Sequence, residues 1–474
     1  MQRVIVAASM RRHRRASTVV AASVVFAGGA ALAQPKAPSA APPLPPPTRF
    51  APVIDDPMLA PPARAATELG SWAEARKLLA AGSTELRRAD AGIARADGRA
   101  RQARAALRPT ARFSAEASID LLHPDTAPNI PPGADYTPTS PLVTGAISVR
   151  SPLLDLAARR GRDAAAADQR VAALDRADAE RQVAQRAARA LIAVVAAERA
   201  AELNRVGLRQ ALERAALGKR TYELGAATEL DVVRTDQDVA LARAALIAGD
   251  EQLRRAREAL GLALGVDGAV GVRPGLAGDG LLVEIGERCH PLKTGEERAD
   301  VAAALAAVEA ARARKAQAKA GYLPSIDFTS NLFAYTTDPA PGRFASWTVG
   351  LVLSVPIWEG GARAGAIAER AAAEADAVAV TDDVRRNAKV EASRARRGED
   401  VAGSLVTAAT DARSLAERID AMTRRSFEIG RATSLELVQS AAALRQAELT
   451  LSLREFERLQ AQVDTLLTES RCVP

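Results

Sequence analysis

Few residues in this chain have the chemistry for catalysis or metal binding. The 474 residues include three histidines, His13, His123 and His290, and two cysteines, Cys289 and Cys472. Cys289, His290 and Cys472 are metal-binding residue types, but they lack the paired spacing of a zinc ligand set. So few groups also supply no nucleophile with a neighbouring base. The sequence therefore predicts no enzyme activity and no metal site.

A glycine-rich segment at residues 265–280 is the second candidate for a ligand site. It contains six glycines, but it lacks the Lys-Ser/Thr pair of a phosphate-binding loop and a preceding strand. We interpret this segment as part of a connector, and we predict no cofactor.

The two cysteines allow two interpretations. In an oxidising compartment Cys289 and Cys472 can form a disulfide, and two separate thiols fit the sequence equally well. Cys472 follows the last predicted helix, and Cys289 lies in the segment after the equivalent helix of the first half. Both are therefore expected at the same level, midway along the molecule.

Charge and composition exclude several classes of protein. Apolar residues make up 48% of the chain but aromatic residues only 3%, which suits long, closely packed helices better than a large globular core. The net charge is +7, and five of the positive charges are arginines in residues 1–33, which hold no acidic residue. Those residues read as a secretory signal peptide, with a cut after Ala33. The mature chain is close to neutral, so nucleic-acid binding loses its support.

The remainder of the chain falls into two matching halves. The sequence of residues 222–233 aligns with that of residues 427–438, and each segment carries a Gly-x-x-Thr-x-x-Asp/Glu turn between two predicted helices. Pro109 corresponds to Pro324, and Pro152 to Pro356. Such a correspondence indicates an internal duplication. The expected organisation is a signal peptide (1–33), a Pro-rich leader (34–65), a first repeat (66–265) with a β-hairpin at 110–151 and a turn at 225–231, a connector (266–297), a second repeat (298–470) with a β-hairpin at 324–356 and a turn at 430–436, and a tail (471–474).

The predicted hairpins indicate a membrane and partner chains. Their four strands alternate apolar and polar residues over about 8–10 positions, the length and period of strands that cross a bilayer in a β-barrel. No mature segment offers about 18 unbroken apolar residues for a transmembrane helix. Four strands cannot close a barrel, and open edges are not tolerated in hydrocarbon. Three copies would supply a 12-stranded barrel. Four ordinary strands on a soluble helical scaffold are the alternative.

Several short motifs occur in this order. They are Leu323-Pro324-Ser325, the run Val-Pro-Ile-Trp-Glu-Gly-Gly-Ala-Arg at 355–363, and the paired turns. Residues 66–470 thereby resemble the TolC family of outer-membrane efflux proteins. The resemblance implies a mainly α fold with a small membrane β part. It implies a homotrimer whose 12-stranded β-barrel crosses the outer-membrane lipid of a Gram-negative bacterium and continues into a long periplasmic α-helical barrel.

In that family the Gly-x-x-Thr turns form the periplasmic tip, where the helices gate the pore. The resemblance carries this role to the residues of the two turns, which are Tyr222, Gly225, Thr228 and Asp231 in the first and Phe427, Gly430, Arg431, Thr433 and Glu436 in the second. A ring of carboxylates at a narrow pore would favour cations. Both acids also suit the first turn of a helix, where the dipole stabilises negative charge. The chain departs from the family pattern at Ala432 and Gln439.

The function implied by the resemblance is passive export through the outer membrane, with docking on a periplasmic adaptor and an inner-membrane pump. The main alternative is a periplasmic coiled-coil adaptor. Adaptors usually have one helical hairpin flanked by compact β domains, and this chain has two hairpins and no such domains. The identity of the cargo, whether drugs, metal ions, solvents or protein, is not encoded in these motifs.

Overall fold

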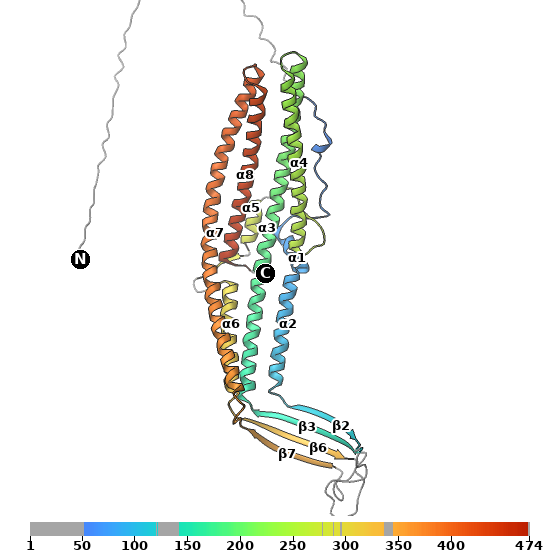
Figure 1. The fold of residues 1–474 in the computed structure, drawn as a ribbon, viewed down its shortest axis with the longest axis vertical. Coiled ribbons are helices and arrows are strands. Elements are labelled where there is room, and N and C mark those ends of the chain that lie inside the picture. Colours follow the sequence, from blue (N-terminus) through green and yellow to red (C-terminus); the bar gives the residue numbers. More distant parts are fainter. Residues whose placement is uncertain are drawn as a thin grey trace, which may run out of the picture. The chain divides into compact units, whose positions relative to one another are not determined.

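The computed structural model describes residues 52–119, 121, 142–276, 278–287, 289–293, 296–335 and 345–472. The predicted signal peptide, the first part of the leader and most of both hairpin loops lie outside these residues. Long helices account for most of the described chain (Figure 1). The mainly helical fold expected from the sequence is thereby confirmed.

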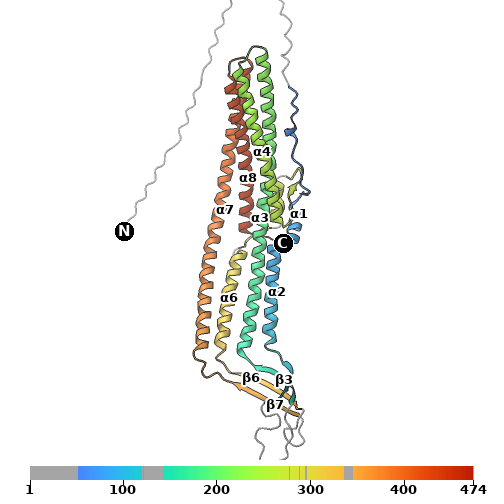
Figure 2. The same ribbon diagram turned by 45° about the vertical axis from the view of Figure 1, so that its right-hand side comes forward.

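Helix α3 is the centre of the helical bundle. It contacts α2, α4, α6 and α8, whereas α7 packs against α6 and α8. Figure 2 shows the same arrangement from a second direction. At about 1.5 Å per residue, the 68 residues of α3 extend about 100 Å. The bounds of these helices are Thr84–Ala105 (α2), Leu156–Glu223 (α3), Glu229–Leu264 (α4), Ala299–Ala320 (α6), Ala362–Glu428 (α7) and Ser434–Glu469 (α8).

The first helix is shorter than the sequence suggested. The sequence predicts one helix from Trp72 to about Leu107, but the structure divides it into α1 (Trp72–Gly82) and α2. Ser83 leaves the helical conformation with ψ at 115°, and its hydroxyl accepts a hydrogen bond from the backbone N–H of Leu86. The serine thus caps the new helix. The region therefore forms two helices with a capped break between them, and the prediction of a single helix is wrong.

Short elements form a belt where α1, α3, α4 and α8 meet. Their bounds are Thr67–Leu69 (β1), Val270–Val272 (β4), Gly278–Gly286 (α5), Cys289–Pro291 (β5) and Ser470–Cys472 (β8). Strand β1 pairs with β4, and β5 pairs with β8. The large apolar side chains concentrate here, with Leu191, Leu260 and Leu281 among the fully buried ones. The segment expected as a plain connector therefore carries part of the main core.

The leader segment just before β1 lies against the helices. Asp56 pairs with Arg243 of α4 at 2.9 Å, and the carbonyl of Ala63 accepts a hydrogen bond of 2.9 Å from Arg257. Met58 packs against a second apolar cluster, centred on Leu208 and Leu246 of α3 and α4. This part of the leader is extended apart from one 3-10 turn, at Pro57–Leu59.

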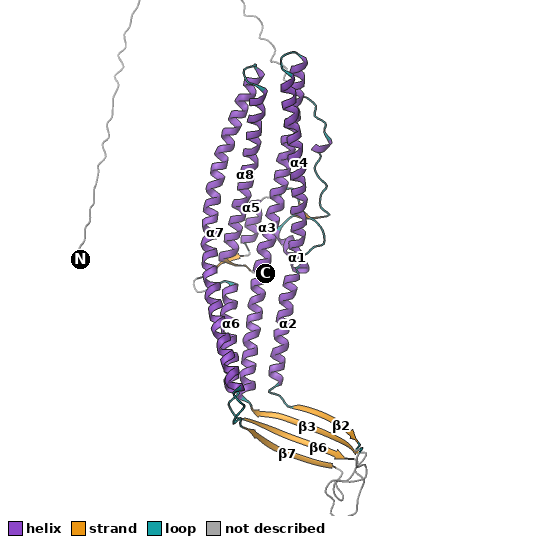
Figure 3. Ribbon diagram, in the orientation of Figure 1, coloured by secondary structure: helices purple, strands orange, loops and turns teal. Residues whose placement is uncertain are grey.

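Four strands form an antiparallel sheet at one end of the helices (Figure 3). Its order is β2–β3–β6–β7, so the β3–β6 pair joins two hairpins. Within the described chain, β2 and β7 each have a neighbour on one side, which leaves two edges whose backbone groups lack a partner. The bounds are Thr110–Ser118 (β2), Leu142–Leu154 (β3), Ser325–Tyr335 (β6) and Ala345–Ser354 (β7). β3 runs past its predicted end, through a register shift between Pro152 and Leu154.

One face of this sheet is apolar across all four strands. Phe113 lies opposite Ile147, Ile147 opposite Leu332, and Leu332 opposite Trp347. Because antiparallel partners share a face, these four side chains form one row. Trp347 is 74% exposed and Leu351, four residues along β7, is 68% exposed. The protomer thus presents a broad apolar surface that its own residues do not cover.

The opposite face of the sheet is polar. Arg150 on β3 and Asp327 on β6 form an ion pair of 2.5 Å across that face. The side chains of Thr329, Asn331 and Thr348 lie on the same face. The sheet therefore has one apolar face that is open to the surroundings and one polar face. Among the described helices, none combines the length and the apolar character needed to cross a bilayer.

Candidate functional site: the paired helical turns

The two turns at the far end of the helices have the same backbone design. Gly225 and Gly430 adopt φ values of 72° and 71°, a left-handed conformation that glycine accepts without steric cost. The N–H of Ala226 donates to the carbonyl of Thr221 at 2.9 Å, and that of Arg431 donates to Ser426 at 2.8 Å. Each glycine therefore ends one long helix and reverses the chain.

A capping box starts the helix after each turn. The backbone N–H of Thr228 donates to the Asp231 carboxylate at 2.9 Å, and that of Thr433 donates to Glu436 at 2.7 Å. In return, the N–H of Glu436 donates to the Thr433 hydroxyl at 3.3 Å. These contacts satisfy backbone donors that a helix end leaves free. The bonds from the backbone N–H and then the hydroxyl of Thr433 hold the pKa of the Glu436 carboxyl below its ordinary value.

Asp231 also connects the two turns. Its second carboxylate oxygen accepts a hydrogen bond from the hydroxyl of Ser434, at the start of α8. This bond is the largest cause that lowers the pKa of Asp231, and the bonds from Thr228 add to it. Ser434 is 2% exposed. The sequence analysis did not identify Ser434 as a site residue, because its contact with Asp231 depends on how the two helical hairpins pack together.

The other predicted tip residues are not drawn into this contact. Tyr222 is 48% exposed, Phe427 is half-buried and Arg431 is exposed. Glu436 bonds within its own turn and has no recorded ion pair with another described residue. The structure therefore brings Asp231 together with a residue that was not predicted, and it leaves Glu436 facing solvent in the single protomer.

A buried ionic cluster makes a second connection between the hairpins. Asp238 of α4 accepts two hydrogen bonds from Arg214 of α3, at 3.1 and 2.5 Å. Arg445 of α8 lies 3.7 Å from the other oxygen of the same carboxylate. Asp238 is 2% exposed and Arg214 is 7% exposed. Asp231–Ser434 and Asp238–Arg445 thus tie α4 to α8 at two levels, and we call these two contacts the tip ties.

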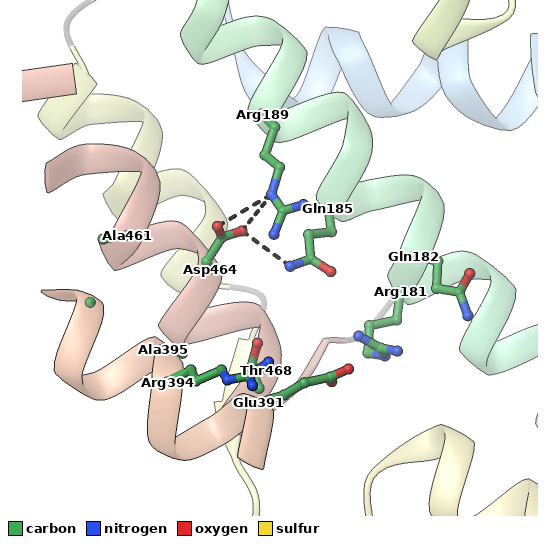
Figure 4. Close-up of a pocket in the computed structure, with 11 residues that line it drawn as sticks. Arg181, Gln182, Gln185, Arg189, Glu391, Arg394, Ala395, Ala461, Asp464 and Thr468 are labelled. Carbon is green, nitrogen blue, oxygen red and sulfur yellow. Dashed lines mark hydrogen bonds and ion pairs between the residues drawn. The ribbon is translucent and has the colours of Figure 1, made fainter. Parts of the chain in front are cut away.

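A polar cavity of about 560 Å³ lies farther from the turns, between α3, α7 and α8. Asp464 accepts hydrogen bonds there from Arg189 at 2.9 Å and from Gln185 at 3.1 Å (Figure 4). Arg394 and Glu391 line the cavity from α7. Its charged groups are arginines and carboxylates, so it offers ion pairs rather than a nucleophile with a base.

The two cysteines lie on paired strands in the belt of short elements. Cys289 is buried and lies directly opposite Cys472 in the antiparallel β5–β8 pair. Cross-strand partners have Cα atoms about 4.5–5.5 Å apart, which is within the range that a disulfide spans. Of the two interpretations that the sequence left open, the backbone register favours a disulfide rather than two separate thiols.

Long helices, paired turns at one end and an open amphipathic sheet at the other form a fold that solved structures share. The outer membrane protein VceC from Vibrio cholerae aligns with a TM-score of 0.68 at 17% identity, covering 84% of this chain and 96% of its own. The CmeC outer membrane channel of Campylobacter jejuni aligns with a TM-score of 0.71 at 15% identity, covering 89% and 92%.

A third structure, a membrane protein from Pseudomonas aeruginosa, aligns with a TM-score of 0.69 at 22% identity and covers 87% of this chain and 99% of its own. The model of the outer membrane efflux protein family matches residues 75–266 and 293–465. The chain therefore belongs to the outer membrane efflux protein family, and the resemblance to TolC-type channels is confirmed. No curated protein matches the chain.

Proposed function

We propose that this protein is the passive exit duct of a tripartite efflux or type I secretion system. The observation that carries the proposal is the sheet, whose apolar face is exposed on all four strands while its opposite face is polar. Placed in the outer membrane, the apolar face contacts lipid and the polar face lines the pore. The helices continue from the sheet into the periplasm as the walls of the same conduit.

Closure of the pore requires further copies of the chain. The edges β2 and β7 each present a row of backbone donors and acceptors, which hydrocarbon does not tolerate without partners. Pairing β2 of one copy with β7 of the next would satisfy both rows. Three copies give twelve strands, and their helices then form one periplasmic barrel, so we propose a homotrimer.

The paired turns would act as the periplasmic gate of this barrel. In the single protomer the tip ties hold the start of α4 against the start of α8, which limits how far the hairpins can separate. Asp231 carries the tie nearest the end, and the exposed Glu436, repeated three times, would place negative charge around the opening. The tip would also face the periplasmic adaptor that connects the duct to its inner-membrane pump.

Two measurements test the duct itself. The full chain, extracted from the outer membrane in mild detergent, is expected to have the mass of three copies and to conduct ions in a planar lipid bilayer. A soluble monomer without conductance would overturn the proposal. That result would instead favour the alternative, a periplasmic adaptor protein.

A serine variant tests the gate. Ser434→Ala removes the hydroxyl that binds Asp231, a bond to a charged group worth about 1.5–3 kcal/mol. We expect the open state to become roughly tenfold more populated, seen as longer openings. Ser452→Ala is the matched control, because its buried hydroxyl lies on the same helix and has no hydrogen-bond partner among the described residues. Equal openings in both variants would refute the gating role.

A further inference from the structure

The helices are strongly basic where they meet the sheet. The twelve residues next to each strand end, at 98–109, 155–166, 313–324 and 355–366, together hold eleven basic and three acidic residues. The twelve residues of each helix nearest the turns, at 212–223, 229–240, 417–428 and 434–445, hold eight basic and ten acidic residues. The positive charge therefore belongs to one end of the helices and is not a general property of them.

Five of these cations lie within six residues of a strand and share two properties. Each is exposed, and none forms an ion pair with another residue in the described part of the chain. Two lie on the last turn of α2 and the segment after it, two on the first turn of α3, and one on the last turn of α6. We call this set the basic belt, and its members are Arg104, Arg108, Arg159, Arg160 and Lys319.

Four of the other six basic residues in the windows next to the strands form ion pairs, and the remaining two, Arg99 and Arg101, lie farther from the sheet than the basic belt. Arg162 pairs with Asp163 at 2.8 Å. Arg314 pairs with Asp168 at 2.5 Å, and Lys315 pairs with Glu374 at 2.9 Å. Arg363 pairs with Glu359 and also stands 5.7 Å from the centre of the Tyr322 ring. All five cations within six residues of a strand thus lack an ion pair, whereas four of the six farther away have one.

Exposed aromatic and apolar side chains mark the same level. Trp358 is 85% exposed and Ile357 94%, both in the link from β7 to α7. Tyr322 and Leu323, in the link from α6 to β6, are 50% and 47% exposed. Amphipathic aromatic residues concentrate where hydrocarbon gives way to headgroups. This second observation places the strand–helix junction at a membrane surface independently of the charges.

We propose that the basic belt binds the phosphates of anionic phospholipids at the periplasmic surface of the outer membrane. This inference rests on the proposed function, because the sheet must span that membrane for the belt to reach its headgroups. Six helical residues extend about 9 Å, and the headgroup layer on each side of a bilayer is about 5–8 Å thick. The long side chains of the belt therefore end among the headgroups.

The chemistry of the belt selects the anionic lipid. Guanidinium groups bind phosphate oxygens through two parallel hydrogen bonds, and an uncompensated cluster attracts a net negative headgroup more than a zwitterionic one. The three acidic residues in the windows next to the strands are already engaged. Asp155 caps α3 through the N–H of Ala158, Asp163 pairs with Arg162, and Glu359 pairs with Arg363. None of them forms an ion pair with the basic belt.

Quenching of tryptophan fluorescence by brominated lipid tests the proposal. Trp72 is buried in the belt of short elements, so a Trp347→Phe background leaves Trp358 as the exposed fluorophore at the junction. Full-length protein is reconstituted into vesicles that contain brominated phosphatidylglycerol or brominated phosphatidylcholine. We expect about a three- to fivefold preference for phosphatidylglycerol at Trp358, weakened at high salt.

Neutralising the belt supplies the decisive comparison. The variant R104Q/R108Q/R159Q/R160Q/K319Q is expected to lower the preference to about one. The control variant is expected to keep the preference for phosphatidylglycerol. It replaces five exposed arginines that lie away from the sheet and have no ion pair among the described residues, namely Arg87, Arg88, Arg199, Arg209 and Arg418.

The outcomes separate the two proposals. A conducting trimer whose preference is absent, or is unchanged in the belt variant, overturns the lipid site alone. A belt variant that keeps its lipid preference but changes the ion selectivity of the pore also overturns it, because the cations would then line the lumen. A chain that neither inserts nor conducts overturns the proposed function and the lipid site with it.

Discussion

Replacing Asp238 by asparagine removes the negative charge from the buried cluster that joins α3, α4 and α8. The variant keeps the shape of the side chain but leaves Arg214, which is 7% exposed, without a counter-charge. Breaking a buried ion pair by removing one partner costs about 3–5 kcal/mol. Asparagine can still accept one hydrogen bond, and Arg445 is farther away, so we expect the lower end, about 3 kcal/mol.

Hydrogen exchange measures this change locally. A loss of about 3 kcal/mol should lower the protection of α4 amides around residues 235–246 roughly 10²-fold, while amides of α6 keep theirs. Glu251→Gln is the matched control on the same helix. Its carboxylate is 46% exposed and pairs with Arg254 and Arg255 within the helix, so its removal should cost at most about 0.5 kcal/mol.

Two results would refute this reasoning. If Asp238→Asn lowers protection no more than Glu251→Gln does, the cluster does not stabilise the hairpin. If protection falls equally in α6, the effect is global rather than local. A charge-free cluster, made by Arg214→Met, Asp238→Leu and Arg445→Met together, should regain most of the protection, because it leaves no member as an isolated buried charge.

Three further predictions concern the apolar face of the sheet, the gate and the pairing of Cys289 with Cys472. Leu351→Lys puts a charge on the lipid face and should cost about 2–4 kcal/mol, so the yield of heat-resistant trimer falls, whereas Thr348→Lys on the polar face leaves that yield unchanged. The lowered pKa of Asp231 means that its tie is fully present above the unfolded pKa of about 3.9 and is lost as pH falls through the folded value. Conductance should therefore be constant between pH 8 and pH 5 and rise only below about pH 4, and a rise near pH 6 would contradict this. Alkylation without reductant should add no mass at Cys289, and a shift of two alkyl groups would exclude the bridge.

The elements themselves were largely predictable. Pro109 and Pro324 fix the ends of helices because proline disfavours helical conformation in the residue before it. The turn glycines and the Thr-x-x-Asp/Glu boxes are local signals that involve a few neighbouring residues. The break at Ser83 was missed, because a serine within a helical pattern resembles a solvent-facing position until its capping bond is seen.

The contacts between the hairpins were not predictable in the same way. Asp231 was a candidate because of its place in a turn, but its partner Ser434 lies 203 residues later. The same holds for Asp238 and Arg445, which come from different halves of the chain. Neither spacing nor composition identifies such pairs, since their proximity depends on how α4 and α8 pack.

By itself, the sequence determined the helices, the turns, the alternating strands and the family, because periodicity, proline, glycine and capping residues act over a few positions. The tertiary structure decided which residues meet. It placed the apolar positions of four strands on one face through their register, brought Asp231 to Ser434, and set Cys289 opposite Cys472. It also gathered basic residues from three helices at the rim of the sheet. These relations join segments that are distant in the chain, and only the packing of long helices brings them together.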